Sequence, residues 1–535
     1  MRCLNYKSNP FPILLLLLFG LHIIIFIFSP YKSFFTGEDF QWLTMIECHH
    51  FNFEEKFLFR PLLRFYFLIT TKFLKIPILY FHIINHLFHF IGAVLLMFFI
   101  YKLTKKYFLS FLTSFIFSIH YINTNVTFTI RRIDEILATI FSLCSLIFFL
   151  NFMQKKKKVY YISSIFTMIL AFLSRETSII LPILLLTLCF IYSPGKVKTK
   201  TNQILPFLFI AFIFSTIRIC VPPSPSLEKE RIKVLMEENY YRLALLAVGL
   251  QLLFIPFDFQ GDEVDFLYLW QHNMLIAWLI VFIYLSLIFI IKNRHYRFSL
   301  IWTGIALIPA LFYPDSIMRE KYLYSPLTGT AFFLSLIISD IINSLRFRKI
   351  YYSLFIIGFL IISSTSRLER KKDFIEVSET VKNTIQFLNT KVISPGPSII
   401  YIINHRYYIN RFATFPGSWA HLFAYARSIP RYYWPKVPIF INIEFPPDEE
   451  LSLERIKSLL FYIFTTSRSK KKILLSEKIR DIFYTDCPFV FPGDNCLYGI
   501  DSLFPSSWKR YIFYFDPTQL RLVDLSFFIN LLTKD

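Results

Sequence analysis

Residues 78–106 read ILYFHIINHLFHFIGAVLLMFFIYKLTKK, an apolar run that ends in three lysines. A helix of this length crosses the hydrocarbon core of a bilayer, which takes roughly 20 residues. Similar runs recur through the first 365 residues, and we predict an α-helical membrane domain of about eleven transmembrane helices. The predicted spans are 11–29, 78–101, 107–121, 133–153, 159–173, 177–192, 203–220, 272–291, 299–313, 322–345 and 351–365.

The distribution of charge predicts the orientation of these helices. The 535 residues include 57 Lys and Arg against 36 Asp and Glu, a net charge of +21 that in a soluble protein would suggest a nucleic-acid partner. With the N-terminus inside, six short cytoplasmic segments hold eighteen of the basic residues and no acid, as the positive-inside rule requires. These segments are 1–10, 102–106, 154–159, 193–202, 292–298 and 346–350. We therefore attribute the charge mainly to orientation, and we predict no nucleic-acid partner.

Two further apolar stretches, 57–76 and 242–257, would invert this pattern if they crossed the membrane. We predict that both are interfacial or re-entrant helices on the outer side. The first belongs to an external loop, residues 31–77, and the chain beyond residue 365 forms a separate external domain. Strand-like runs at 398–404, 437–443 and 510–515 alternate there with helical ones at 448–465 and 476–483, which predicts an extracytoplasmic α/β domain.

The cysteines give little support to a metal site, because the seven of them include no CxxC pair. Cys487 and Cys496 flank a turn in the external domain, and in an oxidising compartment we expect them to form a disulfide.

Charged residues gather at the outer ends of the predicted spans, where an ion in apolar surroundings needs a partner or a use. The first external loop carries Glu38-Asp39, adjacent carboxylates that could act as a general base, bind a divalent metal or remain solvated loop acids. It also carries Arg60, which could hold a phosphate or extend to lipid headgroups. Three more clusters on the same face contain His120, Arg131, Arg132, Asp134 and Glu135; Arg175 and Glu176; and Arg319, Glu320 and Lys321.

The order of these clusters resembles the GT-C superfamily of polytopic glycosyltransferases, and most closely its protein O-mannosyltransferase-like branch. The motifs that carry the resemblance are Glu38-Asp39, Phe59-Arg60-Pro61-Leu62, the His- and Asn-containing segment 81–89, His120 followed by 132–137, Ser174-Arg175-Glu176-Thr177, and 319–326. They cover roughly residues 10–345. The chain departs from the family pattern in having Glu38 where Asp is usual, Lys321 where Arg is usual, and no tetratricopeptide repeats.

The resemblance implies transfer of a sugar from a polyprenyl-phosphate donor to an acceptor hydroxyl on the extracytoplasmic face, with inversion. Asp39 would be the general base, assisted or positioned by Glu38. The candidates for holding the lipid phosphate are Arg60, Arg132, Arg175, Arg319 and Lys321. Further site candidates are His120, Asp134, Glu176 and Glu320. No cofactor is implied, although a divalent metal remains an alternative. The acceptor could be a protein, a lipid or a glycan.

Two other functions fit parts of the sequence. A transporter or flippase of a lipid-linked or glycan substrate would share the many spans, but would place charges near the membrane midplane or show inverted repeats. An anchor for a binding module would leave the outer charged clusters unexplained. High Phe, Ile and Lys usage with little Gly suggests an AT-rich bacterial genome, which would place the protein in the inner membrane and its C-terminal domain in the periplasm.

Overall fold

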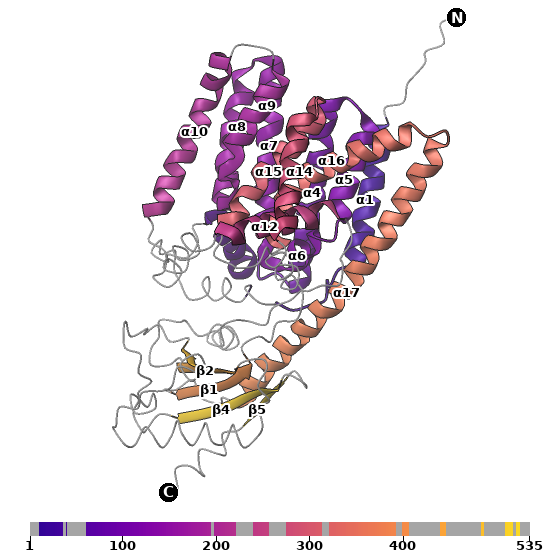
Figure 1. The fold of residues 1–535 in the computed structure, drawn as a ribbon. Coiled ribbons are helices and arrows are strands. Elements are labelled where there is room, and N and C mark those ends of the chain that lie inside the picture. Colours follow the sequence, from indigo (N-terminus) through magenta and orange to yellow (C-terminus); the bar gives the residue numbers. More distant parts are fainter. Residues whose placement is uncertain are drawn as a thin grey trace, which may run out of the picture. The chain divides into compact units, whose positions relative to one another are not determined.

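The structure is a computed structural model, shown in Figure 1, and it divides into two compact units. The first unit comprises Met1–Tyr31 and Asn52–Lys372, and the second comprises Lys32–Phe51 and Asp373–Asp535. The residues described are 10–35, 39, 60–193, 197–220, 239–255, 274–312, 320–391, 398–405, 439–445, 483–485, 509–516 and 521–524. The predicted domain boundary after residue 365 stays a prediction.

The first unit is a bundle of helices (Figure 1). Its α-helices are α1 (Phe11–Ile27), α3 (Pro61–Phe67), α4 (Ile78–Thr104), α5 (Tyr107–Ile119), α6 (Asn123–Phe128), α7 (Ile133–Lys155), α8 (Lys158–Ser174), α9 (Leu181–Tyr192), α10 (Val197–Cys220), α12 (Asn239–Phe254), α14 (Met274–Ile290), α15 (Arg294–Leu307) and α16 (Tyr324–Asn343). The helix α17 (Arg348–Lys391) begins in this unit. Short 3-10 helices span Ile130–Arg132, Glu176–Ile180, Ile308–Phe312 and Glu320–Leu323, and a π-helix spans Leu68–Phe73.

Each predicted span falls on one of these helices, which confirms the helical membrane fold. By length and composition, four of the described helical segments can cross a bilayer: Ile78–Thr104, Ile130–Lys155, Tyr324–Asn343 and Arg348–Thr384. Seven shorter apolar helices accompany them in the described part of the chain. The number of spans therefore stays a prediction.

The two stretches that we predicted to be interfacial or re-entrant helices on the outer side differ from each other, and the side on which they lie stays a prediction. Residues 61–73 form the short α3 and the π-helix that follows it. The second stretch forms α12, which packs against α14 and α16 and buries Leu245, Val248 and Leu253. α12 is thus part of the helical core.

Short turns join neighbouring helices at two of the lysine-rich segments predicted to be cytoplasmic. Lys105 ends α4 and Lys156 ends α7, both in the left-handed region with φ of 58° and 56°. Each donates its backbone N–H to the carbonyl four residues earlier, Tyr101 and Phe152, at 2.8 Å. This arrangement satisfies a terminal helix carbonyl and lets the chain reverse within two residues.

Small residues bring several helices close together, as is usual where both sides of an interface are apolar. In α7 and α8, Ser145 and Ser164 each donate a hydroxyl hydrogen bond to the other's backbone carbonyl, both at 2.9 Å. Between α15 and α16, Gly329 lies against Thr303: a Cβ on Gly329 would be 2.7 Å from the Thr303 hydroxyl. The outside of the bundle is apolar, as Phe289 on α14 illustrates with 83% exposure.

The described part of the second unit contains a five-stranded sheet of order β3-β2-β1-β4-β5. β1 (Ser398–His405) is parallel to β2 (Ile439–Phe445) and β4 (Lys509–Asp516), and the edge strands β3 (Phe483–Thr485) and β5 (Arg521–Asp524) are antiparallel to their neighbours. The three predicted strands thus coincide with β1, β2 and β4.

The helix predicted at 448–465 lies outside the described residues, as do Cys487 and Cys496. Of the helix predicted at 476–483, the structure describes Phe483 alone, and this residue begins strand β3. The α/β class of the tail and the disulfide therefore stay predictions. Parallel neighbours such as β1 and β2 need a crossover of a dozen residues or more, and residues 406–438 separate these two strands.

Candidate functional site

A group of buried charges lies where α7 begins, in the first unit. Asp134 is in the first turn of α7 and has no exposed side-chain surface. Its Oδ1 accepts the backbone N–H of Glu135 at 2.9 Å, and a carboxylate at this end of a helix is stabilised by the helix dipole. The second carboxylate oxygen remains available to cations.

Arg60 connects Asp134 to Glu176. The residue immediately precedes α3, which begins at Pro61, where proline is well tolerated. The Arg60 guanidinium donates from Nε and Nη2 to the two carboxylate oxygens of Glu176, at 2.9 Å and 2.7 Å. Its Nη1 donates to Oδ2 of Asp134. A paired two-bond contact of this kind fixes the orientation of both groups.

Arg175 joins the same network from the end of α8. Its Nη1 lies 3.2 Å from Oδ2 of Asp134 and 2.7 Å from Oε1 of Glu135. The guanidinium also lies over the ring of Tyr322, with 5.7 Å to the ring centroid. Arg175 is 1% exposed, so these contacts form away from bulk water.

Two further arginines, Arg131 and Arg132, stand in the 3-10 helix that leads into α7 and are also buried. Both are within electrostatic range of Asp134 and Arg175. The side-chain amide of Asn85 on α4 anchors this turn by donating to the carbonyl of Thr129 at 3.0 Å.

We refer to Arg60, Arg131, Arg132 and Arg175 with Asp134, Glu135 and Glu176 as the arginine cluster. Four cations face three carboxylates, so the ionised cluster carries one net positive charge among the described residues. Guanidinium groups gathered in this way are suited to the binding of a phosphate.

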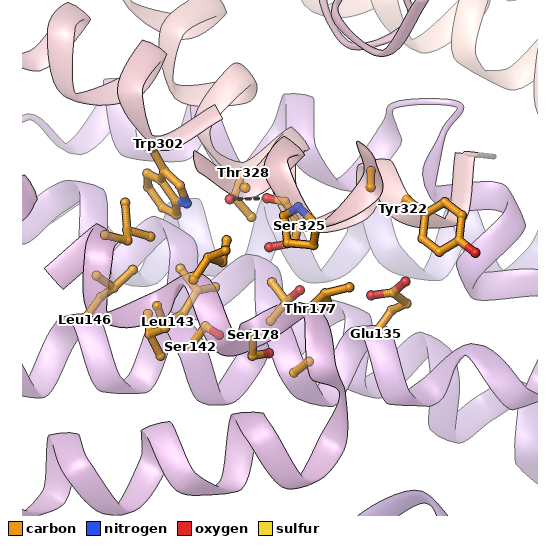
Figure 2. A pocket seen from close by; sticks show the side chains of 18 residues that line it. Glu135, Ser142, Leu143, Leu146, Thr177, Ser178, Trp302, Tyr322, Ser325 and Thr328 are labelled. Atoms are coloured by element: carbon orange, nitrogen blue, oxygen red, sulfur yellow. Dashed lines mark hydrogen bonds between the residues drawn. The ribbon is translucent and has the colours of Figure 1, made fainter. Parts of the chain in front are cut away.

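A pocket of about 30 Å³ adjoins the cluster at Glu135 (Figure 2). Glu135 and Tyr322 lie at one end in this view, and Trp302 and Leu146 lie at the other. The lining mixes hydroxyl and apolar side chains: Thr139, Ser142, Thr177, Ser178, Ser325 and Thr328 with Ala138, Leu143, Ile180, Leu181, Leu184, Ala306, Pro309 and Ala310. The enclosed space is enough for about two water molecules.

The structure brings together Arg60, Asp134, Arg175 and Glu176, and places Arg132 within their electrostatic range. His120 lies elsewhere, at the corner between α5 and α6, stacked on Tyr121 with ring centroids 4.8 Å apart. Arg370 and Arg367 on α17 are within electrostatic range of His120.

The remaining candidates are described only in part. Asp39 is 1% exposed and belongs to the second unit. Glu38 and Arg319 lie outside the described residues, and for Glu320 and Lys321 the description covers the 3-10 helix of the backbone. Within the described residues, no group of three or more His, Cys, Asp or Glu could hold a metal ion.

Sequence reasoning did not assign a role to Glu135, which pairs with Arg175 and lines the pocket. Its position next to Asp134 was a usable signal, because a second acid at the start of an apolar helix needs a cationic partner. Tyr322 was also missed. Its ring lies under the guanidinium of Arg175, which is 147 residues earlier in the chain, and no local sequence pattern shows this contact.

Comparison with known proteins gives a family match for part of the chain. Residues 64–220 match the family model described as dolichyl-phosphate-mannose-protein mannosyltransferase. None of the curated proteins compared with the chain matches it. Among solved structures, the crystal structure of ArnT from Cupriavidus metallidurans bound to undecaprenyl phosphate is 11% identical, with a TM-score of 0.40 over 86% of this chain and 96% of that chain.

The matched range contains most of the arginine cluster, including Arg132, Asp134, Arg175 and Glu176. Arg60 precedes it by four residues. The family match thus confirms the resemblance of this chain to the GT-C superfamily of membrane glycosyltransferases.

Proposed function

We propose that this protein transfers a sugar from a polyprenyl-phosphate donor to an acceptor hydroxyl on the extracytoplasmic side of a membrane, with inversion at the sugar carbon. The observation that carries the proposal is the arginine cluster, in which four buried arginines lie with three carboxylates at the beginning of α7. The family description supports the donor class, since dolichyl phosphate is a polyprenyl phosphate.

The arginines of the cluster have two different roles in this proposal. Arg60 directs Nε, Nη1 and Nη2 at carboxylates, so its role is to hold Asp134 and Glu176 in place. Arg132 and Arg175, with Arg319 and Lys321 from the other charged motif, are the candidates for contact with the donor phosphate. Cations fixed before the reaction lower the barrier, because they stabilise the negative charge that develops on the departing phosphate.

Asp39 acts as the general base in this mechanism, and Glu38 assists or positions it. Asp39 removes the proton from the acceptor hydroxyl while the hydroxyl oxygen attacks the anomeric carbon on the face opposite the phosphate. The bond between that carbon and the phosphate oxygen breaks, and polyprenyl phosphate leaves with the bonding electrons. A single displacement of this kind inverts the configuration of the sugar carbon.

The remaining parts of the proposal concern location and acceptor. The lysine-rich turns at Lys105 and Lys156 support a cytoplasmic position for that end of the bundle. The arginine cluster, near the opposite ends of α7 and α8, would then face the outside, which in a bacterium is the periplasm. The acceptor is a protein, a lipid or a glycan that carries a free hydroxyl.

The test is sugar transfer by the purified full-length protein, with a radiolabelled polyprenyl-phosphate sugar and extracted envelope acceptors. We expect Asp39→Asn to lower the rate by a factor of about 100 or more, in line with the loss of a general base. Asp340→Asn is the matched control, because Asp340 is exposed at the end of α16. Full activity of Asp39→Asn, with unfolding temperatures unchanged, would overturn the assignment of the base.

A further inference from the structure

Arg367 is a buried cation within α17, at the end of the apolar run that opens this helix. Its side chain is 2% exposed, and its Nη2 donates to the backbone carbonyl of Ser118 at 3.1 Å. Its Nε and Nη1 have no hydrogen-bond partner among the described residues. A guanidinium in these surroundings is costly unless its charge and its N–H groups are compensated.

Among the described residues, no carboxylate is in the set of charges that act on Arg367. Its strongest charged neighbour in the described part of the chain is another cation, Arg370. Arg370 is itself bound to the Thr124 hydroxyl at 2.7 Å and lies 4.9 Å from the centroid of the Tyr121 ring. The other groups within electrostatic range of Arg367 include His22 and His86.

Hydrogen bonds fix the protons of two neighbouring histidines. His89 has its Nε2 3.2 Å from the carbonyl of Ser118, so Nε2 carries a proton, and Nδ1 accepts from the Tyr324 hydroxyl at 2.8 Å. Ser118 donates its hydroxyl to the carbonyl of Ser114, so its oxygen accepts from Nε2 of His22 at 3.0 Å. Both ring nitrogens of His89 are therefore bonded in its neutral form, whereas Nδ1 of His22 is buried and has no hydrogen-bond partner among the described residues.

His86 completes the surroundings on α4. It is 5% exposed, and neither of its ring nitrogens has a hydrogen-bond partner among the described residues. The ring meets Phe26 of α1 edge to face, with centroids 5.2 Å apart. A neutral imidazole has one N–H, so His86 provides a donor that, like two nitrogens of Arg367, is buried and unused.

We propose that Arg367 and His86 bind a small monoanion such as chloride, between α1, α4, α5 and α17. One negative charge would offset the charge of Arg367, and the N–H groups of Arg367 and His86 would donate to the ion. The low exposure of both side chains favours a free, compact anion over the headgroup of a lipid. The bound ion would join α17 to the helices that it packs against, independently of the proposed transfer reaction.

The first test is thermal unfolding of the full-length protein in detergent, in sodium chloride or sodium gluconate at equal ionic strength. We expect chloride to raise the unfolding temperature by several degrees in a saturable manner, since a ligand that binds the folded state stabilises it. Arg367→Gln should abolish this dependence. Arg346→Gln, the same substitution in the exposed turn before α17, should retain it.

A second measurement on the unaltered protein covers the case in which Arg367→Gln fails to fold. Crystals soaked in bromide should show an anomalous peak within hydrogen-bond distance of Arg367. Equal unfolding temperatures in chloride and gluconate would overturn the proposal, as would bromide crystals with ordered water alone, or a lipid phosphate, at this position.

Discussion

Replacing Asp134 by Asn tests whether the arginine cluster is a single ion-paired unit. Oδ2 of Asp134 receives Nη1 of Arg60 and, at 3.2 Å, Nη1 of Arg175. In Asp134→Asn these two cations would face a neutral amide, in a place with no exposed surface. Loss of one partner of a buried ion pair costs about 3–5 kcal/mol when the remaining charge has no other partner. Arg60 keeps Glu176 and Arg175 keeps Glu135, so we expect the lower end of this range.

The control is Asp340→Asn, the same substitution at an exposed carboxylate. Asp340 accepts the hydroxyl of Tyr296 at 2.7 Å, so this substitution also neutralises a hydrogen-bonded carboxylate, while the Asn amide oxygen can still accept. In water such a contact contributes about 0.5–1.5 kcal/mol, and we expect a small effect.

The assay is thermal and denaturant unfolding of both purified variants in the same detergent. Asp134→Asn should unfold at a clearly lower temperature than Asp340→Asn, and it should also lose sugar transfer because Arg60 and Arg175 are no longer held together. If the two variants lost equal stability, the cluster would not be the tightly coupled, desolvated unit that its geometry indicates.

Two further predictions concern the backbone. Gly329→Ala should destabilise the protein by about 1–3 kcal/mol, because the added Cβ would lie 2.8 Å from the backbone nitrogen of Thr303 and force α15 and α16 apart. The control is Gly358→Ala, which should be neutral or slightly stabilising because no atom lies within 4 Å of the added Cβ. Equal unfolding temperatures for the two glycine variants would contradict the close packing of α15 and α16 at Gly329. Lys156→Gly should stabilise by about 1 kcal/mol, because glycine adopts the left-handed conformation of this position without strain, whereas Lys155→Gly, inside α7, should destabilise. A lower denaturation midpoint for Lys156→Gly would count against the strained turn.

The helices were predictable from the sequence because the hydrocarbon of a bilayer imposes both length and composition on a span. The run at 78–101 is α4, and the lysines that follow it form the turn to α5. The convergence of Arg60, Asp134, Arg175 and Glu176 was predictable for a related reason. Charges at the same ends of several spans lie at the same depth, where they can compensate one another.

Other features depended on tertiary contacts that local patterns do not encode. The apolar stretch at α12 has the same composition whether it lies on a surface or packs against α14 and α16. Arg367, after an apolar run, has the pattern of a residue that extends to lipid headgroups. Its burial follows from the neighbours of α17, among them Ser118, which lies 249 residues earlier in the chain.

The paired hydroxyls of Ser145 and Ser164 have a consequence for how this protein can evolve. Each hydroxyl donates to the other residue's backbone carbonyl, an acceptor that stays in place whatever the side chain is. A change of one serine to alanine therefore removes one hydrogen bond and leaves the other donor its acceptor. What the two buried positions share is a limit on size, so each should remain a small residue among descendants of this sequence, and a large side chain at either one would separate α7 from α8.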